Sequence, residues 1–141
     1  MPITQAVPNS FKEELFQAEH NFNAAGGNVF KLALYTSAAT LNSATTVYTS
    51  TNEVANSGQY TTGGGILVNV GTSVSSGVAY VDFADISFTG VTLTARGALI
   101  YNSTTGAAVA VLDFGNDKTA TSTFTVTFPT AGATTAIIRF S

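Results

Sequence analysis

The sequence of 141 residues contains no cysteine, no tryptophan and a single histidine, His20. Disulfides and cysteine-based metal centres are therefore excluded, and a metal site or catalytic triad that needs histidine is disfavoured. No apolar run approaches the ~20 residues that a helix needs to cross a bilayer, and no basic segment followed by an apolar stretch marks a secretory signal. The sequence predicts a soluble protein that is made in the cytoplasm and has no membrane partner.

Charge is also scarce. Asp, Glu, Lys and Arg make up only 9% of the residues, against about 25% in ordinary soluble domains. The formal net charge is -3 and the five basic residues are scattered along the chain, so a nucleic-acid partner is not expected. Because charged residues usually protect exposed sheet edges, one interpretation is that much of the surface is covered in a permanent assembly. The alternative is that threonine-rich β proteins tolerate neutral surfaces, and composition does not separate the two.

Two apolar runs near the centre of the chain are joined by turn-forming residues. Residues 98–101 and 107–112 are almost entirely apolar, and residues 102–106 between them read Asn-Ser-Thr-Thr-Gly. This pattern predicts a β-hairpin within residues 96–115. Since the runs are apolar at consecutive positions, both strands are expected to be covered on both faces, inside a sandwich or under a neighbouring subunit.

Shorter apolar segments recur at intervals of about ten residues, separated by Gly, Ser, Thr and Asn. The first, residues 29–36, alternates as expected for a strand with one buried face. The polar stretch 37–62 shows no clear periodicity and is interpreted as a long surface excursion. A charged turn at residues 116–118 is expected to close the hairpin. The remaining strands are predicted at residues 66–70, 78–83, 86–88, 123–128 and 136–140. The fold class is therefore predicted as all-β, an antiparallel β-sandwich with a jelly-roll-like arrangement.

The beginning of the chain differs from the rest. Pro2 and Pro8 lie among scattered apolar residues and predict an extended N-terminal arm. Ser10 and Glu13 have the spacing of a capping box, which predicts one short N-terminal helix over about residues 11–20. We therefore expect an arm and helix over residues 1–22 and a single β-sandwich domain over residues 23–141.

The predicted helix places several apolar side chains close together, and His20 is expected to interact with the dipole at its C-terminal end. The helix is interpreted as a cap on one end of the β-domain, with docking on another protein as the alternative. The side chains that we propose as an interface in the arm and helix are Ile3, Val7, Phe11, Leu15 and Phe16.

Carboxylates give the remaining candidate chemistry. Asp82, Asp85, Asp113 and Asp117 could converge and hold Ca²⁺, or two of them could flank a sugar for hydrolysis. Their spacing matches no known calcium loop, and the chain has no tryptophan for a sugar platform. Arg96 is expected to form an ordinary salt bridge with an acidic neighbour. The sequence therefore predicts no enzyme, no cofactor and no metal.

Segments along nearly the whole chain resemble small virion proteins of tailed bacteriophages, most of all the cement or decoration proteins of HK97-like capsids. These segments are PNSFKEELFQAEHNF, FKLALYTSAATLN, TNEV, YTTGGGIL, VAYVDFADISF, TARGALIYN, AVAVLDFG and AIIRF. The resemblance implies a jelly-roll or related β-sandwich that dimerises and bridges neighbouring major capsid proteins. It implies no catalytic residue.

On this basis the chain is expected to bind the outside of an assembled capsid as a homodimer and to cement major capsid proteins against internal DNA pressure. Its location would be the virion surface. Deleting residues 1–10 is expected to leave the β-domain folded and to weaken capsid binding. The alternatives are a structural protein of the tail or neck, a carbohydrate-binding β-sandwich at a host-facing position, and a weak hydrolase.

Overall fold

The predicted central hairpin is the longest pair of strands in the fold. In the computed structural model, which describes residues 3–140, β6 (Leu93–Asn102) runs antiparallel to β7 (Ala108–Ala120), with Ile100 opposite Ala110. The turn between them is closed by a hydrogen bond from the Asn102 N–H to the Ala107 carbonyl (2.8 Å). The hairpin prediction is confirmed, except that β7 continues through residues 116–118, where the sequence predicted a turn.

The other elements of the described chain are one helix and seven further strands. They are α1 (Asn9–Phe16), β1 (Phe30–Tyr35), β2 (Gly65–Ile66), β3 (Asn69–Ser75), β4 (Val78–Phe83), β5 (Ile86–Thr89), β8 (Thr123–Val126) and β9 (Ile138–Phe140).

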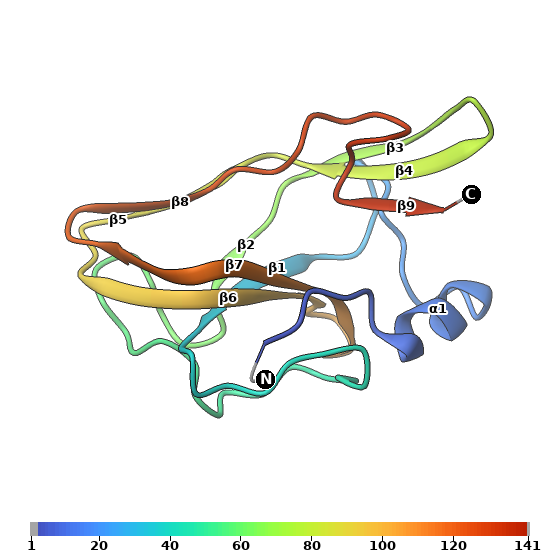
Figure 1. Cartoon of the computed structure of the whole chain (residues 1–141). Coiled ribbons are helices and arrows are strands. Elements are labelled where there is room, and N and C mark those ends of the chain that lie inside the picture. The colour runs from blue at the N-terminus through green and yellow to red at the C-terminus, as the bar shows by residue number, and fades with distance from the viewer. Residues whose placement is uncertain (1–2, 141) are drawn as a thin grey trace.

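The strands form two layers (Figure 1). The lower layer is an antiparallel sheet in the order β2-β1-β6-β7, and the upper layer consists of the sheet β3-β4-β9 and the pair β5-β8. A core of apolar side chains fills the space between the layers, including Leu32 and Ile100 from below and Phe83, Phe88 and Phe124 from above. The all-β, antiparallel class predicted from the sequence is confirmed.

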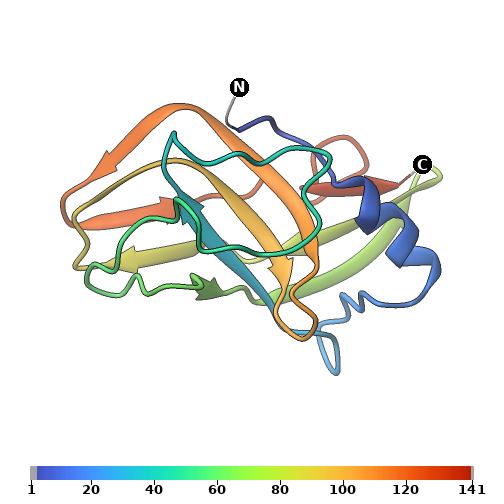
Figure 2. The ribbon, with the colours of Figure 1, turned by 90° about the horizontal axis from the view of Figure 1, so that it is seen from below.

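The outer face of the lower layer is covered by the chain itself. Residues 37–62 contain no strand but cross this face, as the teal and green trace in Figure 2 shows. A second apolar cluster forms there and includes Ala33 and Leu99 from the sheet and Leu41 from the covering segment. This explains the consecutive apolar residues of β6. It also corrects the prediction for β1, which is buried on both faces rather than on one.

The first described residues are part of the same cover. Ile3 is 1% exposed and makes a parallel bridge with Leu41, while Ala6 makes an antiparallel bridge with Val111 of β7. The segment of residues 3–8 is thus not an arm apart from the folded domain, as the sequence suggested, because Ala6 pairs with the edge of β7 and Ile3 is buried. Met1 and Pro2 lie outside the described residues.

Helix α1 begins after Pro8 and ends at Phe16, earlier than predicted. No side chain caps its first turn, and the Ser10 hydroxyl is buried without a hydrogen-bond partner, so the capping-box prediction is wrong. The helix ends because Ala18 adopts a left-handed backbone conformation with a φ of 58°. The chain then turns inward, which places His20 in the interior rather than at the helix terminus.

Candidate functional site

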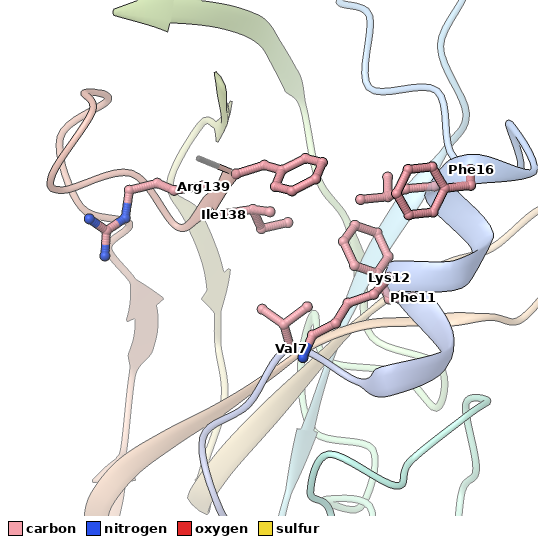
Figure 3. Close-up of a pocket in the computed structure, with 8 residues that line it drawn as sticks. Val7, Phe11, Lys12, Phe16, Ile138 and Arg139 are labelled. Carbon is pink, nitrogen blue, oxygen red and sulfur yellow. The ribbon is translucent and has the colours of Figure 1, made fainter. Parts of the chain in front are cut away.

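An open apolar groove with a volume of about 400 Å³ lies between α1 and β9 (Figure 3). Its walls lie far apart in the sequence, because α1 is the first element and β9 the last strand of the described residues. The residues that line it are Val7, Phe11, Lys12, Leu15, Phe16, Ile138, Arg139 and Phe140.

The groove follows the edge of a strand. β9 pairs with β4 along one side only, with Ile138 opposite Val81 and Phe140 opposite Ala79. Side chains of successive strand residues point to opposite faces. Ile138 and Phe140 therefore share one face of β9, and an adjoining apolar pocket continues from them across that face to Ala79 and Val81 of β4. The groove itself contacts no residue of β4, so it opens at the free edge of β9.

The floor of the groove is fixed and its rim is exposed. Phe11 is 1% and Ile138 is 7% exposed, and both belong to the main core. On the rim, Phe16 is 83% and Phe140 is 59% exposed. Large apolar side chains that are exposed together beside a groove commonly mark an interaction surface. The groove is therefore the candidate functional site of the chain.

The structure gathers four of the five interface residues proposed from the sequence. Val7 and Leu15 are half-buried walls of the groove, Phe16 forms its rim, and Phe11 belongs to its floor. Ile3 lies elsewhere, inside the cluster on the outer face of the lower layer. Burial leaves Ile3 and Phe11 almost no surface for a partner, so the exposed part of this set is centred on Phe16.

The second wall of the groove was missed at the sequence level. Residues 136–140 were predicted as a strand but not as part of an interface. The available signal was the pattern Ile138-Arg139-Phe140, which places two apolar side chains on one side of a strand. What this pattern does not reveal is that β9 is an edge strand and that α1 lies beside it.

Among residues 3–140, the groove is lined by two cationic side chains and by no side-chain carboxylate. Lys12 lies on the wall formed by α1, whereas the guanidinium of Arg139 points away from the other side chains in Figure 3. Neither cation forms a salt bridge within residues 3–140. Lys12 is exposed to solvent, so its ammonium group would attract a negatively charged ligand only modestly.

A second cluster of functional groups surrounds Glu53. Its carboxylate accepts hydrogen bonds from the hydroxyls of Tyr48 (2.5 Å) and Tyr60 (2.6 Å) and from the N–H of Gly63 (2.8 Å). The Tyr60 hydroxyl also accepts a hydrogen bond from the N–H of Leu34 in β1 (2.8 Å). The cluster thus fastens residues 48–63 to the lower layer.

Two further tyrosines complete this network. The Tyr101 hydroxyl donates to the Gly63 carbonyl (2.5 Å), and the Tyr35 hydroxyl donates to the Thr49 carbonyl (2.6 Å). The rings of Tyr48 and Tyr101 stack with their centroids 4.6 Å apart. Each of these tyrosine hydroxyls therefore has a defined partner within the chain.

Burial and the negative charge of Glu53 raise the pKa of all four tyrosines. Burial is the largest cause for each of them, and the hydrogen bond to Glu53 is the second cause for Tyr48 and Tyr60. The raised pKa values keep the phenols neutral, so that they act as hydrogen-bond donors. A tyrosine with a raised pKa is a poor nucleophile or base, and we interpret the network as structural.

His20 lies in the only group of three potential metal ligands within residues 3–140, together with Glu14 and Glu19. Both of its ring nitrogens have partners: Nε2 is 2.9 Å from Glu14 Oε1, and Nδ1 is 3.1 Å from the Asn102 amide nitrogen. These contacts fit a neutral imidazole that donates through Nε2. The group connects α1 to the central hairpin.

The four aspartates considered from the sequence do not assemble as a calcium site, although two of them, Asp82 and Asp85, line one open pocket. Within residues 3–140 they form no group with the spacing of metal ligands. Asp113 pairs with Arg96 (Nε to Oδ1, 3.2 Å), which confirms the predicted salt bridge, and Asp85 accepts a hydrogen bond from the Phe128 N–H (2.8 Å). These two carboxylates serve local structure.

Comparison with known proteins gives no match to a family model, to a curated protein or to a solved structure. In the part of the chain that the structure describes, every helix is too short or too polar to traverse a lipid bilayer.

Proposed function

We propose that this chain is a structural virion protein that binds the outside of an assembled phage capsid and holds neighbouring major capsid proteins together. The observation that carries the proposal is the apolar groove beside the free edge of β9, with Phe16 and Phe140 exposed on its rim. The proposal includes a jelly-roll-like sandwich, a homodimer and a location on the virion surface. It assigns no catalytic residue.

The distribution of polar groups supports a binding role. The carboxylates of Glu53, Asp85 and Asp113 are engaged in hydrogen bonds or a salt bridge within the chain. The exposed chemistry of the groove is apolar, which suits protein–protein contact. We propose the major capsid protein as the partner because the sequence resembles capsid cement proteins.

Capsid stabilisation would follow from mass action. A protein that binds the assembled lattice and not the free subunits lowers the free energy of the assembled state. Each contact can be weak, because many copies act on one particle and each dimer offers two binding surfaces. Two-fold symmetry in such a dimer would bring identical surface patches together.

The alternative functions use the surface differently. A tail or neck protein would bind through the same groove at another location in the virion. A carbohydrate module would need aromatic rings combined with hydrogen-bonding groups, whereas the rim aromatics here are Phe16 and Phe140, which have no polar atom in the side chain. The groove therefore favours a polypeptide partner over a sugar.

Electron microscopy of the phage particle tests the proposal. Particles stripped of this protein are incubated with the purified wild-type chain or with a double variant, Phe16→Ser with Phe140→Ser. We expect regular density on the capsid surface with the wild type. With the double variant, we expect the affinity for the particle to fall by about tenfold or more.

The matched control is Val74→Ser, because Val74 is 73% exposed on β3, at the opposite edge of the same sheet. This variant is expected to bind like the wild type. Density confined to the tail or neck, or no binding to the particle, would overturn the proposal.

A further inference from the structure

The free edge of β9 offers hydrogen-bonding groups as well as apolar surface. β9 is the last strand in the order β3-β4-β9. Apart from the pairing with β4, no backbone group of Ile138–Phe140 has a hydrogen-bond partner within residues 3–140. Unpaired N–H and C=O groups along a sheet edge form a template for another strand.

We propose that an extended segment of the partner protein adds to β9 as a further strand and places its apolar side chains in the groove between β9 and α1. The identity of the partner as the major capsid protein rests on the proposed function. The mode of binding rests on the groove and the strand edge alone. The chemistry required of the segment is large apolar side chains at alternate positions with an acidic residue nearby.

The shape of the site selects an extended segment. The groove contacts three consecutive residues of β9 on one side and side chains of α1 and Val7 on the other. A strand added at the edge would direct every second side chain toward the floor formed by Phe11 and Ile138. Backbone hydrogen bonds would then supply affinity, and the groove would select the side chains.

The charge of the site selects an acidic partner. Within the part of the chain that the structure describes, Lys12 lines the groove without a salt bridge and no side-chain carboxylate lines it. A carboxylate next to the apolar anchors of the incoming segment would pair with the Lys12 ammonium. Such complementarity affects the choice of partner and the rate of association more than the final affinity.

A second copy of this chain fits the groove poorly. A two-fold contact would bring Lys12 of each copy to one interface, to which the described groove residues contribute no side-chain carboxylate. The proposed homodimer would therefore use another face.

Peptide selection tests this proposal without any capsid. A displayed library of random peptides of about ten residues is selected on the folded full-length protein. We expect enriched peptides with large apolar residues at alternate positions and an Asp or Glu beside them. Enrichment with helical spacing, or no enrichment, would contradict strand addition.

The selected peptide is then synthesised with single N-methyl groups on its backbone amides. Because only alternate amides of an edge strand face its neighbour, methylation of one alternating set should weaken binding about tenfold or more, while the other set is tolerated. The amide resonances of Ile138–Phe140 should shift on binding. Equal tolerance of methylation at every position would overturn the proposal.

Protein variants locate the binding site. Phe16→Ser with Phe140→Ser should weaken peptide binding about tenfold or more, and Val74→Ser should leave it unchanged. Lys12→Glu should weaken binding of the acidic peptide, and replacing the acidic residue of the peptide by lysine should restore it. Unchanged unfolding midpoints verify that the variants fold.

The outcomes separate the two proposals. Peptide binding at β9 without decoration of capsids would leave strand addition standing and reject the capsid role. Capsid decoration that is insensitive to the selected peptide as a competitor would reject strand addition and leave the capsid role standing.

Discussion

Two regions of this molecule are rich in aromatic side chains, one around Glu53 and one beside β9. They differ in how many of their hydrogen-bonding groups have partners within the chain. Around Glu53, the tyrosine hydroxyls and the carboxylate pair with one another and with the backbone of β1. Beside β9, Phe16 and Phe140 face solvent and one edge of the strand is unpaired. We therefore interpret the first region as structural, whereas the second region retains unpaired backbone groups and exposed apolar surface for the binding that we propose.

The largest effect on stability is expected from Glu53→Ala. The change removes the acceptor of three hydrogen bonds, from Tyr48, Tyr60 and Gly63. We expect the free energy of unfolding to fall by about 3 kcal/mol, since hydrogen bonds to a charged group are strong and the buried Tyr60 hydroxyl loses a partner. Urea denaturation measures the change.

Glu53→Gln is the control for this prediction, because its side-chain oxygen still accepts hydrogen bonds. It should cost clearly less than Glu53→Ala. If both variants lower the free energy of unfolding by the same small amount, the region around Glu53 does not hold residues 37–62 on the lower layer.

A smaller loss is expected from Tyr60→Phe. The ring still fills the core, but the buried N–H of Leu34 loses its acceptor at 2.8 Å. An unsatisfied buried donor costs about 1–3 kcal/mol, and the midpoint of urea denaturation should fall accordingly. Tyr48→Phe should cost less, because Tyr48 is only half-buried and its removal leaves no buried backbone donor. Similar costs for the two variants would contradict this role of Tyr60.

Alkaline pH should weaken the same region. Burial raises the pKa of Tyr35 and Tyr60 in the folded state, whereas these phenols ionise near pKa 10 in the unfolded chain. The neutral phenols therefore contribute fully to the free energy of unfolding below about pH 10. As the pH rises further, this free energy falls by about 1.4 kcal/mol per pH unit for each group.

Thermal unfolding between about pH 8 and pH 11 measures this loss. Tyr35→Phe should show a shallower decline than the wild type. A decline that is identical in both proteins would show that Tyr35 does not contribute to it.

The smallest effect on stability is expected from Phe16→Ser in the groove. Phe16 is 83% exposed, so the free energy of unfolding should change by less than about 0.5 kcal/mol. The same variant should clearly weaken binding to the partner. A large fall in the free energy of unfolding with unchanged binding would mean that Phe16 serves stability and not binding.

The sequence predicted those parts of the fold that local pattern determines. The central hairpin and the strand β4 (Val78–Phe83) follow from apolar runs between turn residues, and the two-sided burial of β6 follows from its consecutive apolar positions. Long-range contacts were not predictable. Nothing near Ile3 indicates that it will lie against Leu41, and nothing near Pro8 indicates that the segment joins the edge of β7.

The wall of the groove that α1 forms was predictable, because it too follows from a local sequence pattern. Helical spacing brought Phe11, Leu15 and Phe16 together on one element. The contribution of Phe140 depends on which strand is left at the edge of the sheet, and pairing between β4 and β9 decides that. Because residues 79–81 and 138–140 are far apart in the sequence, a local pattern carries no information about it.

The N-terminal segment also changes the expectation for a truncated protein. Because residues 3–8 bridge both Leu41 and β7, deleting residues 1–10 should damage the folded domain itself and not only its binding. Point substitutions in the groove are therefore the cleaner way to separate binding from folding.

The groove is assembled from the first helix and the last strand of the described chain. A ribosome-bound or prematurely terminated copy that lacks β9 would have only one wall of the docking site. The groove would thus be complete only after Ile138–Phe140 have paired with β4, so that its formation would report folding of both regions.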